Sequence, residues 1–407
     1  MAFNNEESCS HGAKTVGVMR RILSRLKERK ATLMCISPIS KYVVYASISA
    51  LRKVRAPVIY IASLNQVDVD GGYTGWTPEE FKAYVFKAVK DLGVGSEIPI
   101  ILQLDHGGPW LKDKHIALNY SYHEAVDNFL KSLEAFIKAG FNLIHIDATV
   151  DMEKSDRFAE LETAANRTAD LISYAEDFAR QYDKCVEYEI GSDRWSYKPP
   201  EVLESFIKKV LSELKRRGID ESKVVFVATD VGTEVRPGNK AEPSTVKAFS
   251  SLVLNYGLYL KVHSGDYLEN PEILPENNVG GVNIGPVYAH IKYSAVKNLL
   301  LEKLSKETAL KLLSELNNLV AFGDKLAKYV SEDINKVEEY RIGLASRYIW
   351  STVQAEAFLD KVASCTGINV RLYLIDRLSK EIEQYAVKLG LSDLASDLAK
   401  DLSDLRK

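Results

Sequence analysis

Short apolar segments alternate with longer amphipathic segments over most of this chain. The short segments are almost continuously apolar, as in strands covered on both faces, and they span residues 32–37, 58–63, 100–105, 143–147, 185–190, 224–229, 258–263 and 281–284. The segments between them repeat their apolar positions with the period of a helix: 41–54, 77–92, 122–139, 156–182, 199–217, 243–256 and 287–301. Eight strands alternating with helices predict a parallel (β/α)8 TIM barrel. A doubly wound open sheet is the alternative, but no Gly-x-Gly-x-x-Gly follows an early strand.

The flanks of this alternation predict the domain organisation. Residues 1–31 form a polar tail and a basic amphipathic helix over 16–30 that is expected to cover the bottom of the barrel. Residues 32–301 form the barrel with the active site. Residues 302–407 read as a helical extension, in which only 369–374 has a strand-like pattern.

Composition narrows the class of protein. The 407 residues are 46% hydrophobic and 27% charged, with a net charge of −3, so neither nucleic acid nor an anionic membrane is an expected partner. No apolar run approaches the roughly 20 residues of a membrane span, and no signal-peptide pattern begins the sequence. The four cysteines, at 9, 35, 185 and 365, lie far apart, as free thiols do in a reducing compartment. A cytoplasmic protein is expected.

Polar residues recur where the predicted strands end, and in a barrel the C-terminal strand ends surround the active-site mouth. Asp105 and His106 end one strand, and Ser63, Asn65 and Gln66 end the strand before it. The later strand ends contribute His145, Asp147, Glu187, Glu189, Arg236, Lys261, His263, Ser264, Gly265, Asp266, Asn283 and Gly285. Each has an ordinary alternative, such as a cap, a turn or a polar barrel layer, but their joint occurrence favours a site.

The residue types indicate metal-assisted chemistry. His106, His145, Glu189 and His263 offer imidazole and carboxylate ligands for a divalent ion, zinc first, with manganese, cobalt, nickel or magnesium as alternatives. Such an ion polarises a carbonyl and stabilises an enediolate. Beside it, Asp105 is the expected proton-transfer group, with Glu189 and Asp147 as further catalytic candidates. The turns at Ser264-Gly265 and Asn283-Ile-Gly285 lie where barrels commonly bind phosphate. The residues expected to bind the substrate or its phosphate are Ser63, Asn65, Gln66, Arg236, Ser264, Gly265, Asp266, Asn283 and Gly285.

Several motifs resemble the tagatose-bisphosphate aldolase subunits of the GatZ/KbaZ type, which are related to the metal-dependent class II ketose-bisphosphate aldolases. The resemblance covers roughly residues 32–300 and rests on Asn65-Gln66-Val, Gly71-Gly-Tyr-Thr-Gly75, Thr77-Pro78, Asp105-His106-x-Gly108-Pro109, His145-x-Asp147, His263-Ser264-x-Asp266-Tyr267 and Gly285-Pro286. The Gly-Gly-Tyr-Thr-Gly loop is the most specific of these.

The resemblance implies a role for individual residues. Asp105 matches the proton-transfer aspartate of the aldolases, and His106 and His263 match metal-binding histidines. Glu189 matches an ancillary metal-site glutamate, and Asn283 an asparagine that contacts substrate. Gly232 stands where the aldolases have a third histidine, so His145 or Glu189 would have to complete the metal site.

Four functions remain open at this point. Retro-aldol cleavage of the C3–C4 bond of a tagatose- or fructose-type ketohexose phosphate makes an aldolase, and re-addition after the same cleavage makes a C4 epimerase of the free or 6-phosphorylated ketose. The resemblance also allows a non-catalytic accessory subunit of a tagatose-bisphosphate aldolase. An unrelated barrel isomerase is the last alternative. The expected partners are a sugar or sugar-phosphate substrate and further copies of the chain, or a catalytic aldolase subunit.

Overall fold

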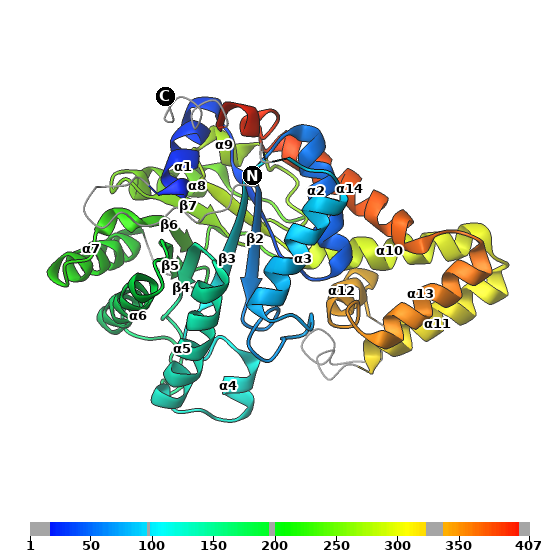
Figure 1. Cartoon of the computed structure of the whole chain (residues 1–407), viewed down its shortest axis with the longest axis horizontal. Helices are drawn as coiled ribbons and strands as arrows, with labels where there is room; N and C mark the ends of the chain where they lie inside the picture. The colour runs from blue at the N-terminus through cyan, green and yellow to red at the C-terminus, as the bar shows by residue number, and fades with distance from the viewer. Residues whose placement is uncertain (1–16, 96–97, 195–199, 323–336, 399–407) are drawn as a thin grey trace.

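Eight parallel strands close into a barrel in the computed structural model of the protein (Figure 1). The structure describes residues 17–95, 98–194, 200–322 and 337–398. The strands are β1 (Leu33–Ile36), β2 (Val58–Ser63), β3 (Ile100–Gly107), β4 (Leu143–Ile146), β5 (Glu187–Ser192), β6 (Val224–Thr229), β7 (Tyr259–Val262) and β8 (Gly281–Ile284). Each strand pairs with the next, and β8 pairs with β1. The predicted (β/α)8 barrel is therefore confirmed.

Helices follow the strands and pack around them, as the amphipathic segments predict. They are α2 (Lys41–Val54), α3 (Pro78–Asp91), α4 (Asp113–Ala117), α5 (Tyr122–Ala139), α6 (Leu161–Gln181), α7 (Pro200–Arg216), α8 (Pro243–Leu254), α9 (Ile273–Glu276) and α10 (Pro286–Lys303). Local sequence fixes where several begin. Thr77 and Ser121 each form a capping box with a glutamate three residues later, at the starts of α3 and α5.

A preceding helix, α1 (Val18–Arg29), closes the N-terminal end of the barrel. Glu187, at the start of β5, accepts hydrogen bonds from the backbone N–H groups of Met19 (2.8 Å) and Arg20 (3.3 Å). The Arg20 guanidinium in turn donates to the carbonyl oxygen of Val224 (2.8 Å), at the start of β6. Glu187 therefore belongs to the end of the barrel opposite the active-site mouth.

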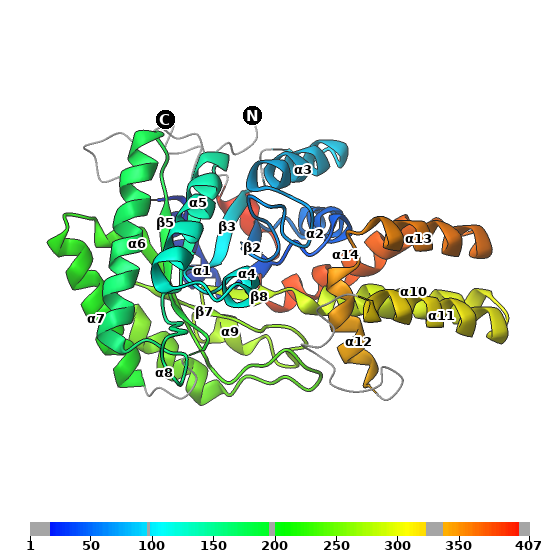
Figure 2. The same ribbon diagram turned by 90° about the horizontal axis from the view of Figure 1, so that it is seen from below.

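The described residues after the barrel form mainly helices. It forms α11 (Lys306–Ala321), α12 (Glu339–Ala345), the short 3-10 helix η4 (Ser346–Tyr348), α13 (Val353–Thr366) and α14 (Val370–Lys388). In Figure 2, α11 and α13 extend away from the barrel beside the far end of α10, whereas α14 returns to lie against it. α14 packs on both α2 and α10.

The strand-like interpretation of 369–374 is wrong, because these residues begin α14. The side chain of Asn369 caps the helix by accepting from the N–H of Leu372. Buried positions then recur with helical spacing, at Val370, Leu374, Leu378, Ile382 and Ala386. The alternation over six residues was too short to distinguish a strand from this longer period.

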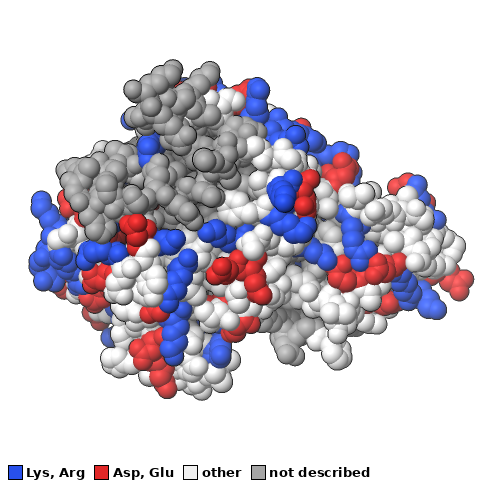
Figure 3. Space-filling view, viewed as in Figure 1, with Lys and Arg blue, Asp and Glu red and all other residues white. Residues whose placement is uncertain are grey.

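Two further expectations concern the surface and the cysteines. Lysine, arginine and acidic side chains are interspersed on the face seen in Figure 3. Among the described helices, none is long and apolar enough to cross a membrane. Cys35 and Cys365 are free thiols, as predicted, but Cys185 is disulfide-bonded and departs from that prediction.

Candidate functional site

Three histidines from different strands converge at the C-terminal end of the barrel. The ring centroids of His106 and His263 are 4.8 Å apart, those of His106 and His145 are 5.0 Å apart, and those of His145 and His263 are 5.3 Å apart. Asp105 and Glu189 lie among them, and potential ligand atoms of Asp105, His145, Glu189 and His263 all lie within 4.8 Å of one another. The structure thus brings together the strand-end residues that the sequence predicts as the metal and proton-transfer groups.

An irregularity in β3 aims His106 into this cluster. The pairing of β3 with β4 shifts register between Leu104 and Gly107, and His106 has a φ of 50°. A Cβ atom on Gly107 would lie 2.8 Å from the carbonyl oxygen of His145, and one on Gly108 would overlap the carbonyl oxygen of Asp147. Only glycines therefore permit the close approach of the two strands.

His145 is held through both of its ring nitrogens. Its Nε2 donates to the carbonyl oxygen of Gly191 at 3.1 Å, since a carbonyl can only accept. Its Nδ1 lies 3.3 Å from Asp105 Oδ1 and 3.2 Å from the backbone nitrogen of His106. Both ring nitrogens of His145 therefore have partners in the chain, and its ring helps to orient Asp105 and His106.

A chain of buried polar groups runs from His263 down into the barrel. His263 Nε2 lies 2.9 Å from Glu189 Oε1. The other oxygen of Glu189 accepts from Lys261 Nζ at 2.7 Å and from Gln103 Nε2 at 2.5 Å. Lys261 also donates to Gln103 Oε1 at 2.6 Å, so the amide and the ammonium group are both satisfied. Gln103, Glu189 and Lys261 are each 0% exposed, which makes this a fully internal ion pair.

Two further aspartates, Asp147 and Asp193, lie beside His106 and His263. Asp147 accepts from the Thr149 hydroxyl (2.6 Å) and the Ser192 hydroxyl (3.0 Å), and its Oδ2 lies 3.5 Å from His106 Nδ1. Asp193, directly after β5, has its Oδ2 3.9 Å from His263 Nδ1. Asp193 was missed from the sequence because β5 was expected to end at residue 190, whereas it continues to Ser192. The acid that follows Gly191-Ser192 was the available signal.

The positive and negative groups of the cluster each favour the ionised form of the other. Burial favours the neutral ring of His106, but the carboxylates of Asp105 and Asp147 outweigh it and raise the pKa of His106 to about 10. Burial likewise opposes ionisation of Asp105, yet His106 and His145 hold the pKa of Asp105 well below its usual range. For Glu189, burial is overcome by Lys261 and His145, which lower the pKa of this carboxyl. At neutral pH, without a bound metal, the cluster is therefore a network of paired charges.

Three groups of side chains have the composition of a metal site among the residues that the structure describes. Besides the group containing Glu189, they are His106 with His145 and Asp147, and His106 with Asp193 and His263. Buried atoms without a hydrogen-bond partner in the described chain include His106 Nδ1, His263 Nδ1 and Asp193 Oδ1. These three residues form the last of the groups, and each has a buried atom without a hydrogen bond, although His106 Nδ1 lies in an ion pair with Asp147 and His263 Nδ1 lies in one with Asp193.

The polar residues after β2 have mostly structural partners. Ser63 pairs with Asp105 in the sheet, and its backbone N–H donates to Gln66 Oε1 at 3.1 Å. Asn65 accepts from the N–H of Asp113 (2.9 Å) and donates to the carbonyl oxygen of Leu111 (3.1 Å). The Asn65 side chain thus joins the loop after β2 to the loop after β3. Both polar atoms of this side chain have a partner within the chain, and its role in substrate binding stays a prediction.

The predicted phosphate-binding turns after β7 and β8 are occupied by groups of the chain itself. The N–H of Gly265 donates to the carbonyl oxygen of Asn283 at 2.8 Å. The N–H groups of Gly285 (3.1 Å) and Val287 (2.7 Å) donate to Asp266 Oδ1. Asp266 therefore caps α10 at the place where the sequence predicts a bound phosphate, and the assignment of Gly265, Asp266 and Gly285 to phosphate binding stays a prediction.

The remaining substrate candidates divide between the site and the surface. Asn283 Nδ2 lies 3.4 Å from both carboxylate oxygens of Asp105, and its Oδ1 is buried without a partner in the described residues. Ser264 adopts a φ of 61° and lies directly after His263. Arg236 forms an ion pair with Glu234 on an exposed loop, and its side chain is 63% exposed. The role of Arg236 in substrate binding stays a prediction.

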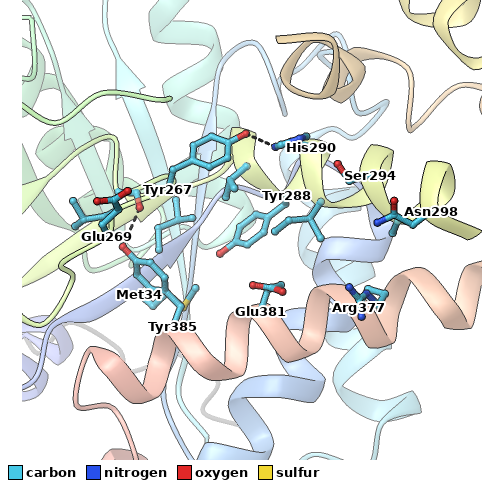
Figure 4. A pocket seen from close by; sticks show the side chains of 16 residues that line it. Met34, Tyr267, Glu269, Tyr288, His290, Ser294, Asn298, Arg377, Glu381 and Tyr385 are labelled. Carbon is cyan, nitrogen blue, oxygen red and sulfur yellow. Dashed lines mark hydrogen bonds between the residues drawn. The ribbon is translucent and has the colours of Figure 1, made fainter. Parts of the chain in front are cut away.

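A separate cavity of about 520 Å³ lies on the outer side of the barrel, between α10 and α14. Tyr267, Tyr288 and Tyr385 surround it, and the hydroxyl of Tyr385 donates to the carbonyl oxygen of Gly265 at 2.9 Å (Figure 4). The catalytic histidine candidates do not line this cavity. The cavity is connected to the site through Tyr385 of α14, which holds the turn that follows His263.

Comparison with known proteins agrees with the motifs. The family model described as D-tagatose-1,6-bisphosphate aldolase subunit GatZ/KbaZ-like matches residues 19–195. The subunits GatZ of Shigella boydii serotype 18 and of Escherichia coli O8 are each 26% identical to the chain over 269 residues, which is 61% of this chain and 62% of each relative. The aligned region thus spans less than two thirds of these relatives. The resemblance to the GatZ/KbaZ type is confirmed over the matched residues.

The fold also has a solved counterpart. A protein from Sinorhizobium meliloti 1021 described as a probable tagatose 6 phosphate kinase superposes with a TM-score of 0.70 at 22% sequence identity. The match covers 90% of this chain and 98% of that one. At this level of identity the likeness supports the shared architecture, including the helical region after the barrel, and nothing about the reaction.

Proposed function

We propose that this relative of the GatZ/KbaZ-type subunits is a metal-dependent carbohydrate enzyme that breaks the C3–C4 bond of a tagatose- or fructose-type ketohexose, free or phosphorylated, by a retro-aldol reaction. The observation that carries the proposal is the convergence of His106, His145 and His263 with Asp105 and Glu189 at the C-terminal mouth of a barrel. A purely structural barrel has no need for three histidines and several ionised carboxylates in one buried cluster.

The residues present fit a divalent ion. His106, His263 and Asp193 would hold it, because their potential ligand atoms lie within 4.8 Å of one another and each residue has a buried atom that makes no hydrogen bond in the described chain. Two imidazole nitrogens and a carboxylate oxygen are a common ligand set for zinc. A bound ion would supply Lewis-acid polarisation of the substrate's C2 carbonyl.

Glu189 then acts through His263 instead of binding the ion itself. Its Oε1 contacts His263 Nε2, whereas His263 Nδ1 is buried and lies 3.9 Å from Asp193 Oδ2. Such carboxylate–histidine pairs fix the orientation of a ligand and raise its basicity. Lys261 and Gln103 fix Glu189 in turn, so the position of one histidine is determined by a chain of groups reaching the barrel centre.

Asp105 is the proposed proton carrier. It is 5% exposed and ionised, and it lies 3.8 Å from His106 Nε2. A carboxylate there can accept the proton of the C4 hydroxyl as the C3–C4 bond breaks, and return it in the reverse direction. Asn283 donates toward Asp105 and offers its free Oδ1 to a substrate hydroxyl.

A C4 epimerase is the second candidate, because the carboxylates of Asp105 and Asp147 lie beside different ring nitrogens of His106. Asp147 faces Nδ1 of His106, whereas Asp105 faces Nε2. Re-addition to the opposite face of the aldehyde places the C4 oxygen in a different position, where a second acid/base group such as Asp147 would be needed to return its proton.

The test begins with the metal content of the purified chain. The metal-loaded protein is then incubated with D-fructose, D-tagatose, their 6-phosphates and their 1,6-bisphosphates, and products are resolved by chromatography. Three-carbon products identify an aldolase, and the C4 epimer alone identifies an epimerase. Absence of turnover by the chain alone, with stimulation of a separate catalytic aldolase subunit, would overturn the proposal in favour of an accessory subunit.

A further inference from the structure

Asp266 occupies the start of α10, next to the candidate site. Its Oδ1 accepts hydrogen bonds from the backbone N–H groups of Gly285 and Val287, at 3.1 and 2.7 Å. The side chain is 2% exposed. Pro286 between them has no N–H to donate, and the N–H of Tyr288 donates to the carbonyl oxygen of Gly285, so the N–H groups of Gly285, Val287 and Tyr288 are all engaged within the chain.

The turn that carries Asp266 is fixed from three sides. The N–H of Gly265 donates to the carbonyl oxygen of Asn283, and the hydroxyl of Tyr385 donates to the carbonyl oxygen of Gly265. The amide of Asn239 donates to the carbonyl oxygens of Ser264 and Asp266, at 2.8 Å each. A Cβ atom on Gly265 would overlap Val282, so the backbone has no room to shift toward β8. These hydrogen bonds hold the turn, and with it the side chain of Asp266, in one position.

This arrangement has a consequence for any ligand above β7 and β8. Barrels that bind phosphorylated substrates commonly use the N–H groups of the loops after these two strands and the start of the following helix. Here Gly265, Gly285 and Val287 have no N–H left to offer. Burial raises the pKa of Asp266 to about 6, so above this pH a phosphate at this position would also face a carboxylate, and like charges repel strongly where water is excluded.

We infer that the end of the substrate lying over β7 and β8 carries a hydroxyl and not a phosphate, so that the site accepts a free or singly phosphorylated ketohexose and excludes the 1,6-bisphosphate. This inference rests on the proposed function, because it specifies the substrate of the same site. Asp266 is the residue that determines the exclusion, and the loss of one charge-assisted contact changes affinity by about ten-fold or more.

Binding tests the inference, and turnover tests the proposed function, so the two can fail separately. We would measure by calorimetry the affinity of the metal-loaded protein for ketohexose 1-phosphate, 6-phosphate and 1,6-bisphosphate. The expected result is that the bisphosphate binds at least about ten-fold more weakly than the better monophosphate, since the N–H groups of Gly265, Gly285 and Val287 are already used within the chain. Equal or tighter binding of the bisphosphate would overturn the inference, whether or not any sugar is converted.

The substitution Asp266→Asn isolates the charge. Asparagine still offers an oxygen to the N–H groups of Gly285 and Val287, and it caps helices about as well as aspartate. The ratio of bisphosphate to monophosphate affinity should rise about ten-fold in this variant, and an unchanged ratio would remove Asp266 as the determinant. Glu269→Gln, in the next part of the same loop, is the matched control and should leave the ratio unaltered. If the Asp266 variant fails to fold, the ranking of the three ligands by the unaltered protein still decides the inference.

Discussion

Lys261 and Glu189 form an ion pair in the middle of the barrel, with Nζ and Oε2 2.7 Å apart and neither side chain exposed. They lie on β7 and β5 and meet beneath the three histidines. Burial favours a neutral amine at Lys261, but the charge of Glu189 reverses this effect and raises the pKa of Lys261. Through Glu189 the ion pair also holds the ring of His263 in position. Removing one of the two charges should therefore lower the stability of the protein and displace His263.

Replacing Lys261 with methionine should destabilise the protein severely. Glu189 would be left as a buried charge with only Gln103 and His263 as partners, and breaking a buried pair in this way costs about 3–5 kcal/mol. Urea unfolding of the metal-free protein measures the loss. The double variant Lys261→Met/Glu189→Gln removes both charges and should recover most of the stability. A single variant as stable as the double one would show that the two charges are not coupled.

The proposed ligands can be tested by metal content alone. His106→Ala and His263→Ala should each lose the bound divalent ion and remain folded, because both side chains lie at strand ends and not in the apolar core. His123→Ala, on the exposed surface of α5, is the matched control and should retain the ion. Elemental analysis after dialysis, with circular dichroism for folding, gives the readout. Full occupancy in both site variants would exclude this ligand set.

Metal affinity should rise with pH. The carboxylates around His106 raise its pKa to about 10, so the ring is protonated in the metal-free protein at neutral pH and the ion must displace that proton. Below the ordinary pKa of about 6.5 the proton also stabilises the fold, and this contribution is lost as the pH rises through about 10. Between pH 7 and 8.5, affinity should therefore increase close to ten-fold per pH unit, measured by competition with a chelator of known pH dependence. Affinity that does not vary with pH would mean that His106 is not a ligand or is already neutral.

The fold could be predicted from the sequence because each strand is an unbroken apolar run and each helix has a clear period. The site could be predicted in part for the same reason: once strands are placed, their C-terminal residues must face one mouth. Asp105, His106, His145, Glu189 and His263 were found in this way, and the structure brings them together.

What could not be predicted depends on partners far apart in the sequence. Lys261 reads as one more polar strand residue until its contact with Glu189, 72 positions away, is seen. Asp266 looks like part of a phosphate-binding turn, and only its hydrogen bonds to Gly285 and Val287 show that it fills the position itself. Asp193 was missed because β5 extends two residues beyond its expected end, and strand boundaries are set by pairing with neighbours more than by local pattern.

Asp105 is the residue whose substitution separates the possible roles most cleanly. Asparagine keeps nearly the same volume and its hydrogen-bonding reach, but it cannot accept a proton at neutral pH. If Asp105 carries the proton of the C4 hydroxyl, Asp105→Asn should retain the metal and lose turnover by a factor on the order of 10²–10⁴. The readouts are metal content, kcat and KM for the best substrate found among the ketoses and their phosphates.

Two other outcomes assign Asp105 differently. Loss of metal together with loss of rate would make it a support for His106 and His145, which it contacts at 3.8 and 3.3 Å. Near-normal turnover would remove it from the mechanism, because asparagine can replace aspartate as a structural hydrogen-bonding group but not as a base. Asp147→Asn provides the comparison across the His106 ring: an aldolase that needs a single base at C4 should tolerate this change better than Asp105→Asn. An epimerase should lose turnover with either substitution, since re-addition to the opposite face of the aldehyde places the C4 oxygen where a second acid/base group is needed.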